Sequence, residues 1–500
     1  MKLPSSVNNW LSITGGILAL FNLATILSLV ILNTFFGFGG TYIGLFIYML
    51  LPGFMIFGLI LIPIGMRIES AKIKKEHREG EIKSWPVINF NNPATRNASM
   101  IFVFGSIFLL IISSIGSYEA FHYTESVEFC GKLCHNVMEP EFVTYHGSSH
   151  ERVACVECHV GAGASWYVKS KMSGLYQVYS VLFHKFPTPI PTPIANLRPA
   201  RETCEQCHWP EKFYDRKVKN LKSYLADDSN TEHDIQLQMK TSSLMTAEGL
   251  EKGIHQHISA EVMIEYKTTA TNRQVIPWVR YTNKKTGVTE VFTDSENPVS
   301  QQKLDSLETR VMDCLDCHNR PSHKYNFPQN FIDMSISTGL ISKSLPGIKE
   351  LSMKILYKEY STKDSAFMAI KEKVTAYYTS KYPDVMASRK GEVDQAITEI
   401  QNGYGNNIFP FMKADWRSYP NNIGHLENDG CFRCHNDRHK SEAGKVISKD
   451  CNLCHIIQAQ GNPGTMEYSN SNKPLEFKHP VDVDTAWKTD LCSSCHLQLY

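Results

Sequence analysis

All 14 cysteines of this 500-residue chain fall into seven short motifs, and their spacing constrains the fold more than any other feature. Six motifs read C-x-x-C-H, whereas the first has one extra residue between its cysteines. In chain order, motifs 1 to 7 contain the pairs Cys130/Cys134, Cys155/Cys158, Cys204/Cys207, Cys314/Cys317, Cys431/Cys434, Cys451/Cys454 and Cys492/Cys495. The histidines that close them are His135, His159, His208, His318, His435, His455 and His496.

This spacing is typical of covalent c-type haem attachment. Two nearby thiols bond to the two vinyl groups of one haem, and the histidine that follows donates an imidazole nitrogen to the iron. Disulfide frameworks, zinc ribbons and ferredoxin clusters need other spacings and give that histidine no role. In motif 1, Gly131 tolerates the backbone angles of a small bulge that absorbs the extra residue. The sequence therefore predicts seven covalently bound haem c groups and no disulfides.

Twelve histidines remain, and a haem with two histidine ligands needs one of them as its second, distal ligand. Their positions near the motifs favour seven distal candidates: His150, His184, His257, His323, His425, His439 and His479. The alternative for each is a surface or hydrogen-bonding histidine. His146 is a weaker candidate than His150, and His255 competes with His257. For motif 1 the candidate is Met138, with ordinary packing or an open iron site as alternatives.

Three apolar stretches, at 11–33, 42–65 and 100–118, precede motif 1, and each is near the ~20 residues that span a bilayer. For the first stretch, a cleaved signal peptide is the alternative. Lysine and arginine gather in the loop 66–99, which the positive-inside rule places in the cytoplasm. We therefore expect a protein of the bacterial cytoplasmic (inner) membrane, with a cytoplasmic N-terminus and a periplasmic haem domain. Haem attachment requires the periplasmic side independently.

The expected fold is a mainly α, membrane-anchored multihaem cytochrome c with a loop-rich haem domain and a small antiparallel β insertion. The predicted domains are a transmembrane anchor over 1–117, a haem domain with motifs 1 to 3 over 118–215, a β-containing insertion over 216–310, a helical region with motif 4 over 311–424, and a C-terminal haem domain with motifs 5 to 7 over 425–500.

Periodicity predicts the elements inside these domains. Apolar alternation at 262–266, 275–281 and 288–292 predicts strands. Helical spacing predicts helices at 348–360, 362–381 and 391–402, and places Leu304, Leu307, Val311 and Leu315 on a helix that leads into motif 4. The proline-rich run 187–193 predicts a stiff, extended connector.

The segments 129–138, 145–150 and 153–161 resemble the NapC/NirT family of membrane-anchored multihaem quinol dehydrogenases, and the match covers about residues 118–210. The seven motifs, three spans and long C-terminal extension resemble the larger, ImcH-like inner-membrane cytochromes of that family. The resemblance implies that menaquinol is oxidised at the outer face of the cytoplasmic membrane. It also implies electron transfer through the haems to periplasmic cytochromes.

Related members bind quinol with a lysine shortly after the second motif, and Lys169 and Lys171 match that place. The alternative is a pair of surface lysines. An aspartate that some members carry seven residues later is replaced here by Tyr176 and Val178. We therefore expect Glu119, Glu125 and Glu128 as alternative acceptors of the quinol protons.

Two other functions remain open. One is an electron-wire subunit whose quinone site belongs to another membrane respiratory subunit. The other is a periplasmic multihaem reductase, which needs an open haem iron and often a C-x-x-C-K motif, and this sequence has no such motif. The net charge of +1 gives no sign of a nucleic-acid partner.

Overall fold

The computed structural model describes residues 7–36, 47, 50–76, 89–132, 135–161, 163–194, 198–209, 213, 216–243, 253–470 and 473–497. The chain forms two compact units, one that ends at Leu133 and one that begins at Cys134. The predicted boundary after residue 117 therefore lies inside the first unit, and the predicted domains beyond residue 133 belong to one unit.

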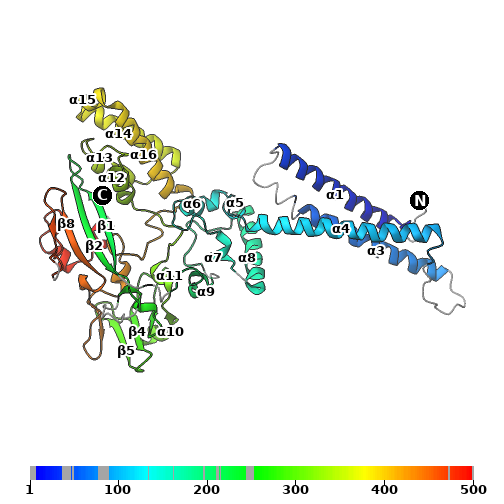
Figure 1. Ribbon diagram of the computed structural model, residues 1–500, viewed down its shortest axis with the longest axis horizontal. Coiled ribbons are helices and arrows are strands. Elements are labelled where there is room, and N and C mark those ends of the chain that lie inside the picture. The colour runs from blue at the N-terminus through cyan, green and yellow to red at the C-terminus, as the bar shows by residue number, and fades with distance from the viewer. Residues whose placement is uncertain are drawn as a thin grey trace. The chain divides into compact units, whose positions relative to one another are not determined.

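The first unit has three helices that are long and apolar enough to cross a membrane: α1 (Trp10–Phe36), α3 (Leu51–Glu76) and α4 (Pro93–Glu125) (Figure 1). Their apolar windows are Trp10–Leu32, Leu51–Lys72 and Thr95–Glu125, in agreement with the three predicted stretches. Most of residues 42–49, where the second stretch was expected to begin, lie outside the described residues. Residues 66–76, predicted as loop, continue α3, so four of the basic side chains lie on a helix end. The short helix α5 (Val127–Lys132) follows α4.

Helices α1 and α3 pack closely because small residues face each other. A Cβ atom added to Gly15 would lie 2.6 Å from the carbonyl oxygen of Gly58, and one added to Gly58 would lie 2.8 Å from that of Gly15. The Ser12 hydroxyl donates a hydrogen bond to the Ile62 carbonyl at 2.9 Å. Close backbone approach and interhelical hydrogen bonds stabilise helix pairs where water is absent. The pair α1–α3 therefore has the packing expected of a membrane hairpin.

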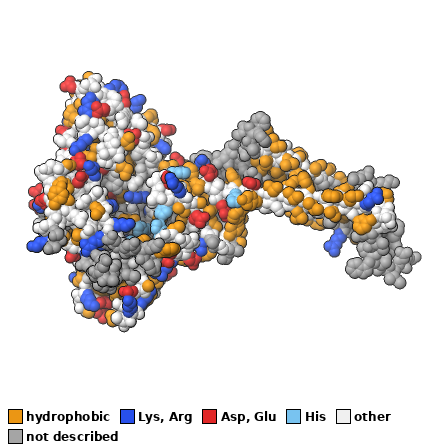
Figure 2. Space-filling model, viewed as in Figure 1, with side chains coloured by type: hydrophobic (Ala, Val, Ile, Leu, Met, Phe, Trp, Pro, Cys, Tyr) orange, Lys and Arg blue, Asp and Glu red, His pale blue; other side chains and the backbone are white. Residues whose placement is uncertain are grey.

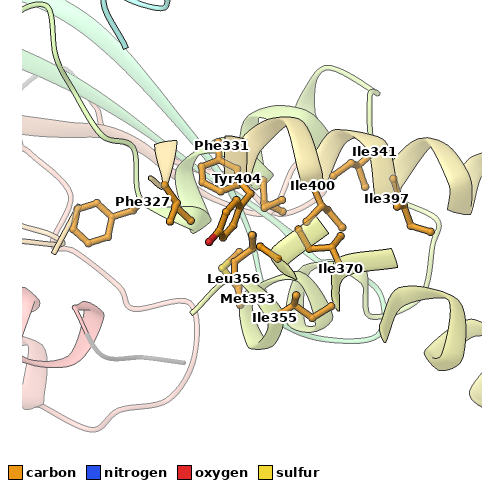
Figure 3. Packing of buried hydrophobic residues seen from close by; sticks show 14 of the residues in the cluster. Phe327, Phe331, Ile341, Met353, Ile355, Leu356, Ile370, Ile397, Ile400 and Tyr404 are labelled. Carbon is orange, nitrogen blue, oxygen red and sulfur yellow. The ribbon is translucent and has the colours of Figure 1, made fainter. Parts of the chain in front are cut away.

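Five helices of the second unit form a helical lobe: α12 (Pro328–Ser337), α13 (Ile348–Leu356), α14 (Lys363–Lys381), α15 (Pro383–Ser388) and α16 (Lys390–Asn407) (Figure 1). The three helices predicted from periodicity correspond to α13, α14 and α16. Thr362 begins α14 because its hydroxyl accepts a hydrogen bond from the Ser365 amide. Phe331, Met353, Ile370 and Ile400 pack into a shared hydrophobic core (Figure 3). Burial of these apolar side chains holds the lobe together.

The second unit also contains two antiparallel sheets. One has the order β1 (Arg216–Tyr224), β2 (Glu232–Lys240), β8 (His455–Gly461), β9 (Glu467–Tyr468). The other has the order β6 (Arg310–Val311), β3 (Val262–Lys267), β4 (Trp278–Asn283), β5 (Thr289–Asp294), β7 (His439–Ser441). The strands predicted at 262–292 correspond to β3, β4 and β5, whereas β1 and β2 were not predicted. Because β7, β8 and β9 come from the C-terminal region, the predicted insertion does not form its sheets alone.

The helix predicted from Leu304 to Leu315 is wrong beyond its first turn. Helix α10 (Gln301–Ser306) ends at Leu307, whose backbone is extended. The next residues form β6, in which Val311 pairs with Glu265 of β3, and α11 (Cys314–Cys317) begins afterwards. Pairing at a sheet edge therefore overrides the helical spacing of the apolar side chains.

Short elements and loops make up the rest of the second unit. The helices are α6 (His135–His146), α7 (Cys155–His159), α8 (Ala164–Leu182), α9 (Ala200–Cys204), α17 (Ala486–Thr489) and α18 (Cys492–His496). The 3-10 turns are η4 (Ile254–Ile258), η5 (Pro410–Met412), η6 (Gly430–Arg433) and η7 (Cys451–Leu453). The proline-rich run 187–193 contains no helix, as predicted, but bends at 188–189 and 192–193 interrupt the extended course that was expected.

Candidate haem-binding site

Motifs 2 to 7 each lie on or beside a short helix or 3-10 turn, formed by α7, α9, α11, η6, η7 and α18. Motif 4 shows how the local sequence begins such a turn. The Asp313 carboxylate accepts a hydrogen bond from the Leu315 amide, and the Asp316 carboxylate accepts one from the Asp313 amide. This reciprocal capping satisfies amides that have no partner within the helix. It places Cys314, Cys317 and His318 within one turn.

The structure brings a second imidazole to each of the six histidines of motifs 2 to 7. A metal–imidazole bond is about 2 Å long, so two rings that bind one iron from opposite sides have centroids roughly 6 Å apart. The six centroid distances are 6.3 Å for His159–His323, 6.0 Å for His208–His150, 6.4 Å for His318–His255, 5.8 Å for His435–His257, 6.1 Å for His455–His425 and 6.0 Å for His496–His479. Each pair therefore has the separation at which two imidazoles could hold one haem iron between them.

Hydrogen bonds orient five of the six partner rings. In each, Nδ1 lies near a backbone carbonyl oxygen: Pro321 for His150, Thr241 for His255, Ile254 for His257, Glu141 for His323 and Val481 for His479, at 2.6 to 3.2 Å. Because a carbonyl oxygen can only accept, Nδ1 carries the proton and Nε2 keeps its lone pair in His150, His255, His257 and His323. Such a bond is the usual support of a metal-binding histidine. In His479, Nδ1 also accepts a hydrogen bond of 3.4 Å from the Val481 amide.

Burial also keeps several of these rings in the neutral form that binds a metal. Loss of hydration lowers the pKa of His323 and that of His455, each to about 4, and it lowers the pKa of His255, His318 and His425. A neutral imidazole has one nitrogen lone pair available for a metal.

His255 and His257 are predicted as competitors, but the structure places each of them opposite a different motif histidine. They lie on η4, a 3-10 turn, in which residues two apart point about 240° from each other around the axis. His255 therefore faces His318 of motif 4, while His257 faces His435 of motif 5. The prediction treated this segment as extended, where residues two apart share a face. The sequence Ile-His-Gln-His at the start of a turn was the signal that could have indicated two ligands on different faces.

Two of the seven predicted distal histidines have other surroundings. His439 is fully buried, with Nε2 2.7 Å from the Ile276 carbonyl oxygen and Nδ1 3.0 Å from Oδ1 of Asn436. His184 is exposed beside Phe186. Within the described residues, the ring contacts place neither histidine against a motif histidine. We therefore do not propose them as ligands. His146 packs on Phe142 and Tyr145 instead.

Motif 1 spans the boundary between the two units, and Leu133 and Cys134 lie outside the described residues. Met138, its predicted distal ligand, is half-buried on α6. Its role as a ligand remains an expectation from the sequence.

Neighbouring motifs contact each other in chain order. Helix α9 packs against both α7 and α11, and the side chains of Cys204 and Cys314 lie near each other. Four further pairs are close enough to interact electrostatically: Cys158 with Cys207, Cys317 with Cys431, Cys431 with Cys454, and Cys451 with Cys492. Motifs 2 to 7 therefore form a continuous row.

A cavity of about 3190 Å³ runs along motifs 3 to 7. Pockets for one drug-sized ligand are about 300–1,000 Å³, so this cavity has room for several large groups. Apolar side chains such as Ile264 and Val279 suit porphyrin rings, while Lys217, Lys219 and Lys324 in the wall suit haem propionates. The residues present therefore fit a set of covalently attached haems.

The motif cysteines differ in their exposure. Five of those that the structure describes are exposed: Cys207, Cys317, Cys431, Cys451 and Cys495. Three of the five, Cys317, Cys431 and Cys451, line the cavity, where a porphyrin edge can meet their thiols. Cys495 lies on α18 and, like Cys207, is outside the lining of this cavity. Cys204 and Cys492, the other cysteines of motifs 3 and 7, do line the cavity, and the attachment role of Cys207 and Cys495 stays a prediction from the spacing of these motifs.

Comparison with known proteins agrees with this geometry. Residues 92–190 match the NapC/NirT cytochrome c family, N-terminal region. The chain is 41% identical over 489 residues to the cytochrome c-type protein ImcH of Geobacter sulfurreducens, and the match covers 98% of this chain and 95% of that protein. The chain belongs to the NapC/NirT cytochrome c family. No solved structure matches it.

Membership of the NapC/NirT family identifies the chain as a membrane multihaem cytochrome with covalently bound haem c and a role in electron transfer. The three apolar helices of the first unit agree with membrane association. The family match ends within the proline-rich run. The sheets and the helical lobe therefore lie in the long extension beyond it.

The two lysines predicted at the quinol site of this NapC/NirT cytochrome both lie on α8. The ammonium group of Lys169 lies 4.9 Å from the ring centroid of Trp166, and that of Lys171 lies 4.9 Å from that of Tyr167. Lys169 is exposed and Lys171 is half-buried. Glu119 and Glu125 lie on α4, and Glu128 lies on α5.

Proposed function

We propose that this cytochrome oxidises menaquinol at the periplasmic face of the inner membrane and passes the electrons along seven haem c groups to periplasmic cytochromes. The six imidazole pairs carry this proposal. An iron with two histidine ligands has no open position for a substrate, which suits electron transfer better than catalysis on the iron. The presence of six such histidine pairs therefore argues against a periplasmic reductase.

The proposed ligand sets follow from the pairs. His323 joins His159 in motif 2, His150 joins His208 in motif 3, and His255 joins His318 in motif 4. His257 joins His435 in motif 5, His425 joins His455 in motif 6, and His479 joins His496 in motif 7. Haems held in this way supply reversible one-electron transfer.

The row of motifs supports a directional role for the chain. Cysteines of successive motifs lie near each other from motif 2 to motif 7. Motif 1 follows the three long apolar helices directly in the sequence. We infer that electrons enter at the membrane end and leave near motif 7.

Lys169 and Lys171 are the proposed quinol contacts. A lysine ammonium group donates a hydrogen bond to a quinol oxygen and favours loss of its proton. Glu119, Glu125 and Glu128 are proposed to accept protons near the membrane. Their carboxylates lie on elements that precede motif 1 in the chain.

The test is reduction of the purified holoprotein by a menaquinol analogue in lipid. Lys169→Gln and Lys171→Gln should each slow haem reduction about ten- to a hundredfold, the effect of losing a hydrogen bond to a charged group. Lys371→Gln, which changes an exposed lysine of α14, is the control. Unchanged rates in both α8 variants, with full haem content, would contradict the quinol site.

The second candidate is an electron-wire subunit whose quinone site belongs to a partner. One observation favours it: none of the apolar window of α4 is buried within the described structure, while α1 packs on α3. In that case the purified chain would show only low-spin haems and no reduction by the quinol analogue. Reduction would return when the partner subunit is added.

A further inference from the structure

Helix α8 presents its large apolar side chains on its exposed face. Seven residues between 48% and 67% exposed recur at helical spacing, six of them on α8 and the last at its C-cap: Val168, Met172, Leu175, Tyr176, Tyr179, Leu182 and Phe183. Intervals of three and four residues place them in one stripe along the helix. Figure 2 shows hydrophobic side chains gathered over this part of the molecule.

Beyond Trp166 and Tyr167, the opposite side of α8 carries smaller or more polar side chains, and most of them pack on the protein, whereas Gln177 is exposed. Ser180 is buried, Gly174 and Val178 are half-buried, and Val181 contacts the hydrophobic core of the second unit. A helix on the surface of a water-soluble domain has the reverse arrangement, with its large apolar residues inside. An exposed apolar stripe of this length indicates a surface that contacts lipid or another protein.

We propose that α8 lies in the headgroup region of the bilayer, with this stripe buried in lipid. The helix has 19 residues but carries Ser170, Ser173 and Gln177 among its apolar residues. Such a helix suits an orientation along the membrane surface rather than across it. In the chain it follows the third membrane helix with only α5, α6 and α7 between them.

Charge and aromatic residues support lipid as the occupant. Lys169 and Lys171 lie near the beginning of α8, and Lys185 lies just beyond its end, where they can meet anionic headgroups. Trp166 and Tyr167 contact the first two lysines. Aromatic rings beside lysines are typical of the membrane interface.

This orientation deepens the proposed function, because it would hold Lys169 and Lys171 at the depth where quinol headgroups arrive. It rests on the proposed membrane anchoring, but it does not depend on quinol oxidation. Lipid contact and quinol kinetics can therefore fail separately.

The test compares two new thiols in the holoprotein, placed in nanodiscs of phosphatidylethanolamine and phosphatidylglycerol. Met172→Cys lies in the stripe, and Met368→Cys lies on α14; the native side chains are 63% and 62% exposed. The native cysteines are proposed to be held as thioethers, so each variant offers one reactive thiol. If lipid covers α8, a charged maleimide should label Met172→Cys about tenfold or more slowly than Met368→Cys.

A photoactivatable phospholipid in the same discs identifies what covers the stripe. Crosslinks should map to α8 and not to α14. Equal labelling rates of the two thiols would overturn the proposal, and so would lipid crosslinks that reach the first unit but not α8. If Lys169→Gln and Lys171→Gln keep the lipid crosslinks and normal quinol kinetics, the quinol site is wrong and the position of α8 stands.

Discussion

At the residue scale, the hydrogen bonds of the ring nitrogens separate the proposed ligand histidines from His439. Nδ1 of His255 and of His323 donates to a carbonyl, which leaves Nε2 for a metal. In His439, by contrast, Nε2 itself lies 2.7 Å from the Ile276 carbonyl. Which ring nitrogen is bonded to a protein acceptor therefore separates proposed ligands from a structural histidine. The distance of a histidine from a motif in the sequence does this less well.

Replacement of one proposed ligand should change the spin state of one haem. His255→Ala removes the imidazole opposite His318 and should give one high-spin haem, visible by electron paramagnetic resonance and in the Soret region. His184→Ala, at an exposed histidine, should leave all haems low-spin. The reverse result would exchange the roles of these two residues.

His439 should make the second unit less stable in mild acid. Burial lowers its pKa below the ordinary value of 6.5, so the unfolded chain takes up a proton first as the pH falls. Stability is therefore lost below pH 6.5, by about 1.4 kcal/mol for each unit of pKa difference. Thermal unfolding between pH 5 and 8 should show a weaker pH dependence in His439→Gln than in the wild type. His184→Gln is the control, and equal slopes in all three proteins would refute the assignment.

At the element scale, close packing distinguishes the pair α1–α3 within the first unit. Gly15 and Gly58 allow the backbones of α1 and α3 to touch, whereas a Cβ atom added to Gly105 of α4 would meet nothing within 4 Å. Apolarity is shared by all three helices, so it cannot decide which of them pair. The small residues decide this through the approach distance that they allow.

Gly58→Val should therefore weaken the α1–α3 pair, while Gly105→Val should not. Forcing extra methyl groups into close packing costs about 1–3 kcal/mol. The measurement is the temperature at which the full chain is lost from detergent solution on heating. This temperature should fall in Gly58→Val and stay unchanged in Gly105→Val. Equal temperatures for both variants would show that α1 and α3 do not depend on this contact.

At the scale of the whole molecule, the sheets join distant parts of the chain. Strand β2 pairs with β8, and β5 pairs with β7, so residues after 424 complete both sheets. Between these sheets in the chain lies η4, which carries His255 and His257. The C-terminal region therefore supports the proposed ligands of motif 4 as well as its own motifs.

A chain that ends at residue 424 should lose more than motifs 5 to 7. Without β7 and β8, the strands β2 and β5 become open edges, and proteolysis within 216–310 should become faster. Motif 4 should show high-spin character. Serine at both Cys451 and Cys454 is the control, since it removes motif 6 but keeps the strands. A truncated chain with a protease-resistant insertion and a low-spin motif 4 would contradict this dependence.

Local patterns in the sequence were enough to predict the three long apolar helices of the first unit, the helices α13, α14 and α16 of the second unit, and the strands β3 to β5. In these segments the period of the apolar residues matches the period of the backbone, so local and tertiary preferences agree. The prediction failed between Leu304 and Leu315, where Arg310 and Val311 pair with β3 at the edge of a sheet. Helical spacing contains no information about a strand that lies more than forty residues away.

The sequence alone determined the seven motifs and their closing histidines, because the attachment chemistry demands neighbouring residues. Only the tertiary structure decided which imidazole faces which motif, because most pairs join residues far apart in the chain: His159 lies opposite His323, and His150 lies opposite His208. The exposed stripe of α8 likewise required the structure. Its apolar residues fit a buried helix equally well, and only packing shows which face the protein covers.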